Sequence, residues 1–531
     1  MPRVETTSVE QLATWASEVT IADVPADVLD LARAQRRSVL AAMAASVDDE
    51  ATGRLLAAVS GWASDGPAPL VTTDRRVSVE DALYAAAAFS VALDSDDYLC
   101  FGHTGHSAVL APILLAAETG ADGEAQLLAQ IVANEVEARL GGAVLLGPMN
   151  GQLWAFIHAA GTALAAGRLL GLDRDRLAHA LAIALAHPMR ATVPGFMAPD
   201  SKLLVAAEPT VAGLRAARLA AVGVTGPLDA LDDRRGALAA LSYAPIPGIL
   251  AGLGTGWATK TLCIKPYPGC AYIDTTVDAL LDLGLGAVDA DDVESVTVDA
   301  GMLTCGMDHL SGPYAAVEPP TPVTVTFSIP WNAAIVLVAG RLTEAETSAE
   351  WLRANAADLA AVRSRVTLRH DAELTTRSAA AFGRLIPGPV LAKDVGARRL
   401  LSAARRVRAE HPTGLGAADL LGLLRTGRSG RAALRAARGG TWWDPAALDG
   451  FQVTFPARVT VRTRDGSEHT AEADVPRGGA GNRETSPIDA ARAKLAASGP
   501  RLWGEAGTAA LDAAIADDDA KLFDLLGGSR S

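Results

Sequence analysis

The feature that most constrains this chain is a run of alanine-rich segments with helical spacing, which fills residues 1 to about 262. Half of the residues are hydrophobic but only 5% are aromatic, so the apolar content is mostly Ala, Leu and Val. Apolar residues recur every three or four positions, which favours helices, and Gly or Pro separates most segments. The predicted helical segments are Val28–Ala45, Ala82–Leu93, Ser107–Glu118, Gln126–Leu140, Trp154–Leu170, Asp175–Ala186 and Pro209–Ala221.

The pattern changes near residue 290, where apolar and polar residues alternate as they do in strands. Strands and helices are mixed from about 267 to 475, which indicates a second domain. Helical spacing returns after 476. The predicted strands are Val293–Val298, Val323–Phe327, Val366–Arg369 and Arg458–Thr463 with a hairpin turn at Asp465–Gly466, and the predicted helices are Trp331–Gly340, Pro487–Ala497 and Thr508–Leu526.

A stretch rich in Arg and Ala, about 372–450, lies within this second region. It is typical of a solvated helical insertion, a lid or an interface element. A nucleic-acid-binding patch is the more specific alternative, but the net negative charge of the whole chain and the lack of interleaved aromatic residues argue against it.

Charge and cysteine content limit the classes of function. The 531 residues suggest two or three domains, and the formal net charge of -14 argues against general binding to nucleic acid or to a membrane surface. The four cysteines form no CxxC pair, so we expect reduced thiols and a cytoplasmic protein. The first residues do not resemble a signal peptide, and no clean apolar run of about 20 residues occurs.

The densest group of chemically reactive residues is LDSDDYLCFGHTGH, residues 93–106. Asp94, Asp97 and Tyr98 are spaced to share one face of a helix. Carboxylates placed close together raise one another's pKa, and His103 lies near enough to transfer protons. Acidic groups at a helix C-terminus also oppose the helix dipole, so three of them there need a compensating reason, which favours a functional role over simple exposure to water. Asp and His are metal ligands too, but no HxxxH or HxH spacing occurs, and we expect no metal.

Two lysines offer positive charge to an anionic substrate. Lys202 comes just before a helix and either binds a substrate carboxylate or extends along the surface. Lys265 lies in KPYPGCAY, where two prolines predict a rigid loop at a helix start. Cys270 in that loop has no paired base, so packing is its expected role. His158 lies on an apolar helix, where a lone His is usually a hydrogen-bonded core residue.

The sequence contains no phosphate loop, no dinucleotide fingerprint in the right context and no GxSxG elbow. We therefore expect no cofactor. Carboxylates, histidines and lysines in separate segments fit proton abstraction next to a carboxylate or carbonyl, in which lysines neutralise the developing enolate.

Six segments follow one another in a characteristic order and spacing: LDSDDYLCFGHTGHSAVLAPILLAAE, AAGTALAAGRLLGLDRDRLAHALAIA, K-x10-GLRAARLAAVGVTGP, KPYPGCAYIDTTVDAL, TFSIPWNAAIVLVAG and FPARVTVRTRDG. Together they resemble the MmgE/PrpD superfamily, which includes 2-methylcitrate dehydratase, cis-aconitate decarboxylase and iminodisuccinate epimerase. The resemblance covers most of the chain outside roughly 372–450.

The resemblance implies a mainly α fold: a large all-helical domain formed by both chain ends, plus a smaller α+β lid domain. The expected limits are 1–266 and 476–531 for the helical domain and 267–475 for the lid, with the insertion at about 372–450. It also implies a homodimer, a cleft between the domains and no cofactor.

The resemblance also assigns residues. The family's aspartate matches Asp94, its following threonine is Tyr98, and its histidine is His103 or His106. Its two lysines match Lys202 and Lys265. We expect Asp94 and His103 to act in acid–base catalysis with Tyr98 as a donor, and the lysines to bind substrate oxygens. The expected substrate-binding residues are Asp97, His106, Asn150, His158, Cys270 and Tyr272.

Two departures from the family pattern put the substrate or the reaction in question. Gly151, beside Asn150, and Cys270 stand where decarboxylase-like members have histidines. The leading hypothesis is a cofactor-independent lyase or isomerase of the dehydratase, decarboxylase or epimerase type. The alternatives are a repurposed member that acts on a larger, less charged metabolite in a biosynthetic pathway, and an inactive binding or scaffold protein.

Overall fold

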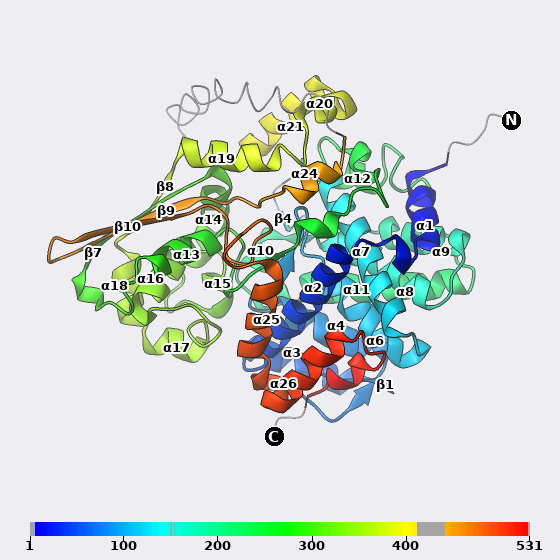
Figure 1. The fold of residues 1–531 in the computed structure, drawn as a ribbon, viewed down its shortest axis with the longest axis horizontal. Helices are drawn as coiled ribbons and strands as arrows, with labels where there is room; N and C mark the ends of the chain where they lie inside the picture. The colour runs from blue at the N-terminus through cyan, green and yellow to red at the C-terminus, as the bar shows by residue number, and fades with distance from the viewer. Residues whose placement is uncertain (1–5, 149–150, 153, 411–440, 529–531) are drawn as a thin grey trace.

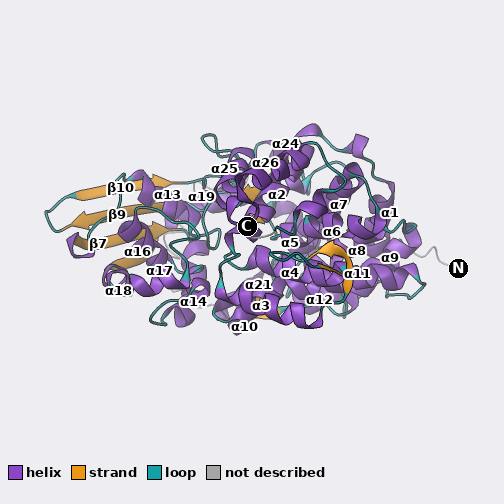
Figure 2. Ribbon diagram, turned by 90° about the horizontal axis from the view of Figure 1, so that it is seen from below, coloured by secondary structure: helices purple, strands orange, loops and turns teal. Residues whose placement is uncertain are grey.

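The chain folds into a large group of packed helices beside a smaller region built on a four-stranded sheet (Figures 1 and 2). The structure is a computed structural model and describes residues 6–148, 151–152, 154–410 and 441–528. Helices predominate throughout, and the sheet lies at one end of the longest axis. The predicted mainly α fold class is confirmed.

The larger region begins with a succession of helices joined by short connections. Three two-stranded ladders accompany them: β1 (Asp65–Pro69) with β2 (Arg76–Val77), β3 (Asp97–Tyr98) with β6 (Cys263–Ile264), and β4 (Gly151–Gln152) with β5 (Ala191–Thr192). The helices are α1 (Ser8–Glu18), α2 (Ala26–Ala45), α3 (Glu50–Trp62), α4 (Val79–Val91), α5 (Gly105–Ala108), α6 (Leu110–Thr119), α7 (Gly123–Ala143), α8 (Ala155–Leu169), α9 (Arg174–Ala186), α10 (Val193–Met197), α11 (Leu204–Ala221) and α12 (Ala237–Leu241).

Side-chain caps and small residues explain these helices. The Asp173 side chain accepts a hydrogen bond from the backbone N–H of Arg176 at 2.9 Å and so caps the start of α9. Helices α8 and α11 pack closely because Gly213 faces α8. A Cβ atom on Gly213 would lie 2.4 Å from the carbonyl oxygen of Ala159, too close for any side chain.

The sheet of the smaller region has the strand order β10-β9-β7-β8. Strands β7 (Val293–Ala300) and β8 (Val366–His370) are parallel, whereas β9 (Ala457–Thr463) pairs antiparallel with β7 and with β10 (Glu468–Ala473). In register, Val296 lies opposite both Val366 and Val461. The strands predicted near 293, 366 and 458, and the hairpin, are confirmed.

The strand predicted at Val323–Phe327 is wrong, because the chain forms a short helix, α15 (Pro322–Val325), at that place. The Thr321 side chain accepts a hydrogen bond from the backbone N–H of Thr324, and the Thr324 hydroxyl in turn accepts one from the backbone N–H of Thr321. Pro322 at the first helical position favours the same start. This local capping outweighs the strand preference of the alternating valines and threonines.

Helices cover the sheet and continue the smaller region. Buried side chains of α13 and α16 form one core with β7 and β9. The Arg/Ala-rich stretch contributes α19, α20, α21 and α24, and residues 411–440 of it lie outside the described residues. The helices here are α13 (Asp274–Asp282), α14 (Met302–Ala315), α16 (Ile329–Ala339), α17 (Ala349–Ala354), α18 (Ala356–Arg363), α19 (Ala372–Phe382), α20 (Gly388–Val395), α21 (Ala397–Glu410) and α24 (Pro445–Asp449).

The C-terminal helices return to the larger region. Helices α25 (Pro487–Ser498) and α26 (Pro500–Ala516) pack against α2, so residues from the two ends of the chain lie side by side. The exact limits of the proposed domains stay a prediction. Among the described residues, no helix combines the length and the apolar character that crossing a membrane requires.

Candidate active site

The acidic cluster of residues 94–97 lies in the connection between α4 and α5, and it is not helical as its spacing predicted. Helix α4 ends at Val91, Asp94 adopts a left-handed backbone conformation (φ 55°), and Asp97–Tyr98 form strand β3. The prediction that Asp94, Asp97 and Tyr98 share one helix face is therefore wrong. Neighbouring residues in a strand point to opposite sides, which separates these side chains.

The pairing of β3 with β6 brings Lys265 beside the aspartates of residues 94–97. Asp97 pairs with Ile264 and Tyr98 with Cys263, and the backbone N–H of Lys265 donates to the carbonyl of Asp96 at 3.2 Å. Lys265 follows β6 directly. Residues about 170 positions apart in sequence are thus fixed beside one another by backbone pairing.

Two buried ammonium groups surround the Asp94 carboxylate. Its Oδ1 lies 3.3 Å from Nζ of Lys265 and 3.9 Å from Nζ of Lys202. Burial raises the pKa of Asp94, but the two lysines outweigh that effect and hold its pKa below the usual value. Asp94 is therefore ionised at neutral pH.

Lys202 also closes the end of α4. It reaches the cluster from the turn before α11, and its Nζ donates to the carbonyls of Val91 at 2.6 Å and Ala92 at 3.3 Å. An ammonium group at the last carbonyls of a helix offsets the negative end of the helix dipole. Lys202 thus places a positive charge beside Asp94, the first of the three aspartates that follow α4. The ring centroid of Phe327, from the smaller region, lies 5.9 Å from the same Nζ.

Asp96 is the centre of the cluster. Its Oδ1 contacts Nζ of Lys265, and its Oδ2 lies 2.7 Å from Nδ1 of His103 and 3.0 Å from Nε2 of His106. Burial raises the pKa of Asp96, but Lys265 and the two imidazoles hold it well below its usual value. Both candidate histidines thus share one ionised carboxylate oxygen.

A second set of buried polar residues, which includes His158 and Glu137, lies next to His106. The ring of His106 packs edge to face against that of His158, with 5.7 Å between centroids. Nδ1 of His158 lies 2.8 Å from the Ser107 hydroxyl, which donates to Glu137 at 2.8 Å. Burial lowers the pKa of His158 well below, and raises that of Glu137 well above, the usual value. The lowered pKa leaves His158 neutral near pH 7, so it is a hydrogen-bonded core histidine, next to His106 rather than to Asp94.

Asp97 faces away from this cluster, toward α2. Its Oδ2 accepts a hydrogen bond from Nε2 of Gln35 at 2.7 Å, and the same nitrogen lies 2.9 Å from the Thr104 hydroxyl and 3.1 Å from Oδ1 of Asn134. Burial and the neighbouring Asp96 raise the pKa of Asp97 to about 6. The structure does not bring Asp97 together with Asp94.

The remaining candidates lie around the cluster. The Tyr98 ring is 6.0 Å from that of His103, and the Tyr272 ring packs against Phe455 at 4.9 Å. Cys270 is buried, and burial and the nearby Asp94 raise its pKa to about 12, so the thiol is protonated and is not a nucleophile. Asn150 lies outside the described residues.

The structure therefore brings together Asp94, His103, His106, Lys202 and Lys265, with Asp96 joining them. Asp96 was not among the predicted site residues, because helical spacing had selected Asp94, Asp97 and Tyr98. If DSDD, residues 94–97, had been interpreted as extended chain, Asp94 and Asp96 would have been placed on the same side. The cluster meets solvent mainly through His103, whose side chain is 21% exposed, and Asp94, at 11%.

One oxygen or nitrogen from each of Asp94, Asp96 and His103 lies within 4.8 Å of the others, a geometry that a metal ion can use. However, Nζ of Lys265 already contacts both carboxylates. The positive charge that a cation would supply is thus built into the chain.

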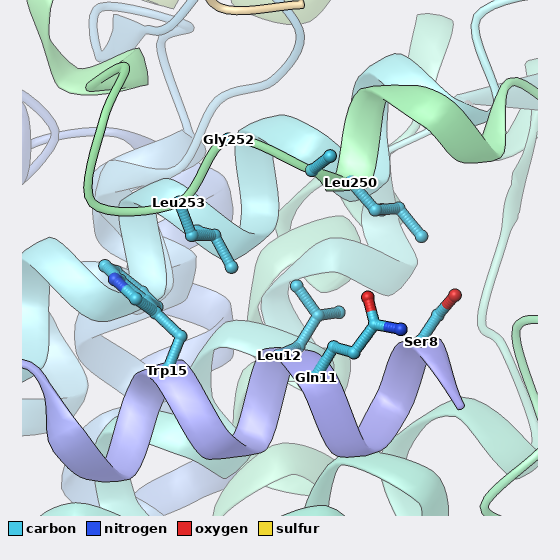
Figure 3. A pocket seen from close by; sticks show the side chains of 8 residues that line it. Ser8, Gln11, Leu12, Trp15, Leu250, Gly252 and Leu253 are labelled. Atoms are coloured by element: carbon cyan, nitrogen blue, oxygen red, sulfur yellow. The ribbon is translucent and has the colours of Figure 1, made fainter. Parts of the chain in front are cut away.

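A separate groove lies between α1 and the loop 250–253 (Figure 3). Its described lining includes Gln11, Trp15 and Leu253 but no carboxylate, imidazole or ammonium group. It therefore offers no acid–base chemistry, unlike the Asp94–Lys265 cluster.

Comparison with known proteins identifies the family. The MmgE/PrpD N-terminal domain model matches residues 10–248, and the MmgE/PrpD C-terminal domain model matches residues 267–391. A cis-aconitate decarboxylase of Aspergillus terreus is 25% identical over 295 residues, 51% of this chain and 59% of the relative. That of Aspergillus terreus strain NIH 2624 / FGSC A1156 is 25% identical over 292 residues, with the same coverage. The aligned region thus spans less than two thirds of these relatives. With both domain models matched in order along the chain, this protein belongs to the MmgE/PrpD family.

Proposed function

We propose that this protein is a metal-independent lyase or isomerase that removes a proton next to a carboxylate or carbonyl group of a small organic acid. The observation that carries the proposal is the buried cluster in which Lys265 contacts Asp94 and Asp96 while Asp96 contacts His103. It combines a base, the group that orients it and the cations that neutralise the product charge.

His103 is the proposed general base. Its Nδ1 faces Asp96, whose low pKa keeps the carboxylate ionised, so Nδ1 carries the proton that is donated to it. The other ring nitrogen, Nε2, then has a free lone pair and can accept a proton from a substrate carbon. Asp96 orients the ring and stabilises the imidazolium that forms.

The two lysines are the proposed electrophilic groups. Proton loss next to a carboxylate or carbonyl places negative charge on the substrate oxygens as an enolate forms. Lys202 and Lys265 are buried, where their charge acts at low dielectric on that enolate. Asp94, ionised and 11% exposed, is the proposed second acid–base group, and Tyr98 is the proposed donor, since burial keeps its phenol protonated.

The distant relationship to cis-aconitate decarboxylase supports a small unsaturated or hydroxylated polycarboxylic acid as substrate. The steps after proton loss (elimination, decarboxylation, epimerisation or ring closure) differ among family chemistries. We propose that the protein acts as a homodimer in the cytoplasm.

The test is proton exchange in D₂O, because exchange reports deprotonation whatever step follows it. The purified protein is incubated with citrate, 2-methylcitrate and cis-aconitate, and loss of each C–H signal is followed by NMR. We expect exchange or turnover of at least one acid, abolished in Asp94→Asn and His103→Ala. His187→Ala is the matched control, because His187 is exposed and distant in sequence from the cluster.

A second candidate is favoured by Gly151 and Cys270, which stand where a decarboxylase-like member is expected to have histidines. It is a repurposed enzyme that performs an elimination, isomerisation or cyclisation on a larger, less charged metabolite. Turnover of any acid in the panel would remove its motivation. If Asp94→Asn and His103→Ala left every measurable function unchanged, a binding or scaffold protein would replace both proposals.

A further inference from the structure

Lys494 is a buried lysine on the C-terminal helix α25, next to the candidate active site. Its residue is 7% exposed, and α25 packs against α2 and β6. The two family models end at residues 248 and 391, so neither reaches it. Nothing in the sequence patterns indicated a role for Lys494 either.

The contacts of Lys494 link three segments that are distant in sequence. Its Nζ donates to the carbonyl oxygen of Ser95 and, at 3.1 Å, to the hydroxyl of Ser38 on α2. Ser95 lies between Asp94 and Asp96, the two carboxylates that share Lys265. Lys494 therefore binds the backbone at the centre of the acidic cluster.

Burying the ammonium group of Lys494 at this position costs free energy. Within the described residues, no carboxylate oxygen lies at ion-pair distance from its Nζ, and both acceptors are neutral. Burial lowers the pKa of Lys494 to about 8, although Asp96, Asp97 and Asp274 act in the opposite direction. An apolar side chain of similar length would avoid this cost.

The backbone that Lys494 binds has an uncommon conformation next to Ser95. Asp94 has φ of 55°, a left-handed conformation that is uncommon for non-glycine residues, although Asp adopts it more readily than most. On one side, the N–H of Asp94 donates to Val91, and on the other, the carbonyl of Asp96 accepts from Lys265. The carbonyl of Ser95, between them, is held by Lys494.

We propose that Lys494 is a positioning residue of the active site. By binding the Ser95 carbonyl it holds Asp94 in its left-handed conformation and keeps both flanking carboxylates at their distances from Lys265 and His103. The catalytic part of this proposal rests on the proposed function, because the two carboxylates must act on a substrate. The structural part, that Lys494 holds the backbone of residues 94–97 in place, requires no substrate.

The alternative is that Lys494 only stabilises the packing of α25 on α2. The two roles differ in what replacement does. If the role is packing, loss of activity follows loss of folded protein. If the role is positioning, Lys494→Met leaves the protein folded, because it removes a buried charge, and lowers turnover.

The experiment compares Lys494→Met with Arg492→Met, a change on the exposed face of the same helix. For the acid that wild type deprotonates, we expect kcat of Lys494→Met to fall about 100-fold, as for a misplacement of about 1 Å, with a melting temperature close to wild type. Arg492→Met should match wild type in both. Lys494→Ala should regain activity with ethylammonium, which can donate to Ser95, but not with tetramethylammonium, which has no N–H.

A crystal structure of Lys494→Met tests the structural part without any substrate. We expect the Ser95 carbonyl to move and the 3.3 Å contact of Asp94 with Lys265 to be lost. Unchanged geometry at 94–97 would overturn the proposal, as would activity lost only in proportion to unfolding and without rescue by ethylammonium. If wild type deprotonates none of the acids, the proposed function fails alone, and the crystal structure still decides the role of Lys494.

Discussion

Nδ1 of His103 lies 2.7 Å from Oδ2 of Asp96, an ionised carboxylate that is itself held by Lys265. Asp97, the next residue, points instead to Gln35. Adjacent aspartates thus have opposite surroundings, one in the proposed catalytic cluster and one in a structural network. This contrast supplies an internal control for the proposed mechanism.

We expect Asp96→Asn to lower kcat by about 100-fold or more, because an amide no longer stabilises the imidazolium and can donate to Nδ1, which favours the wrong tautomer of His103. Asp97→Asn should keep near-normal kcat. Steady-state kinetics on both variants, with the acid that wild type turns over, checks the prediction. Equal losses in the two variants would mean that His103 and Asp96 do not form the working pair.

Lys265 is expected to be essential for stability as well as for turnover. Replacing it with Met leaves two buried carboxylates without their shared counter-charge, which typically costs about 3–5 kcal/mol. The double variant Asp94→Asn with Lys265→Met should recover part of that loss, because one of the stranded charges is gone. Denaturant unfolding of the two single variants and the double variant measures the coupling. Additive losses would show that the 3.3 Å contact carries no stabilisation.

The sequence predicted which residues gather at this site better than it predicted their local structure. The residue types at Asp94, His103, Lys202 and Lys265 indicated acid–base chemistry, and the fold brings these side chains together. The error lay in continuing the helix through residues 94–98: alanine-rich periodicity extends to Leu93, whereas α4 ends at Val91. The end is set by Lys202, more than 100 residues away, which binds the last carbonyls. A single-chain pattern cannot show a tertiary contact of that kind.

The same limit explains why Lys494 was missed, whereas the false strand near 323 has a local cause. Lys494 occurs in an ordinary helical segment, and only the packing of α25 on α2 places it under Ser95. At residues 321–324, alternation of valine and threonine favoured a strand, while the capping box that determines the structure was visible in the sequence and outweighed it. The strands and helices with long, regular patterns, such as β7 and α16, were predicted correctly.

Metal removal gives a further test of the cluster. Because Lys265 already contacts both carboxylates of the Asp94–Asp96–His103 group, we expect full activity after dialysis against EDTA. Added Mg²⁺ or Zn²⁺ should not raise kcat. Activity that EDTA abolishes and a divalent ion restores would contradict the metal-independent mechanism and assign these three residues as ligands.

The pKa of Asp97 predicts how stability depends on pH. Because its folded-state pKa is raised from 3.8 to about 6, the folded state binds the proton more tightly, and the free energy of unfolding falls as pH rises from about 4 to 6. The shift corresponds to about 3 kcal/mol above pH 6. Asp97→Asn has no such charge and still accepts from Gln35. It should therefore be more stable than wild type at pH 7, and the gain should vanish near pH 4. Thermal or denaturant unfolding at both pH values checks this, and an equal gain at both would exclude a titration effect.

Close packing of α8 against α11 should depend on Gly213. A Cβ atom there would lie 2.4 Å from the Ala159 carbonyl oxygen and 2.7 Å from Cβ of Thr162, so the helices must separate. We expect Gly213→Ala to cost about 1–3 kcal/mol from overpacking. Gly53→Ala is the matched control, since Gly53 is an exposed position of helix α3 with nothing within 4 Å of the added atom. That change should stabilise by about 0.5–1 kcal/mol, because alanine favours helix over glycine. Denaturant unfolding measures both, and because α11 begins just after Lys202, Gly213→Ala should also lower turnover, whereas Gly53→Ala should leave turnover unchanged.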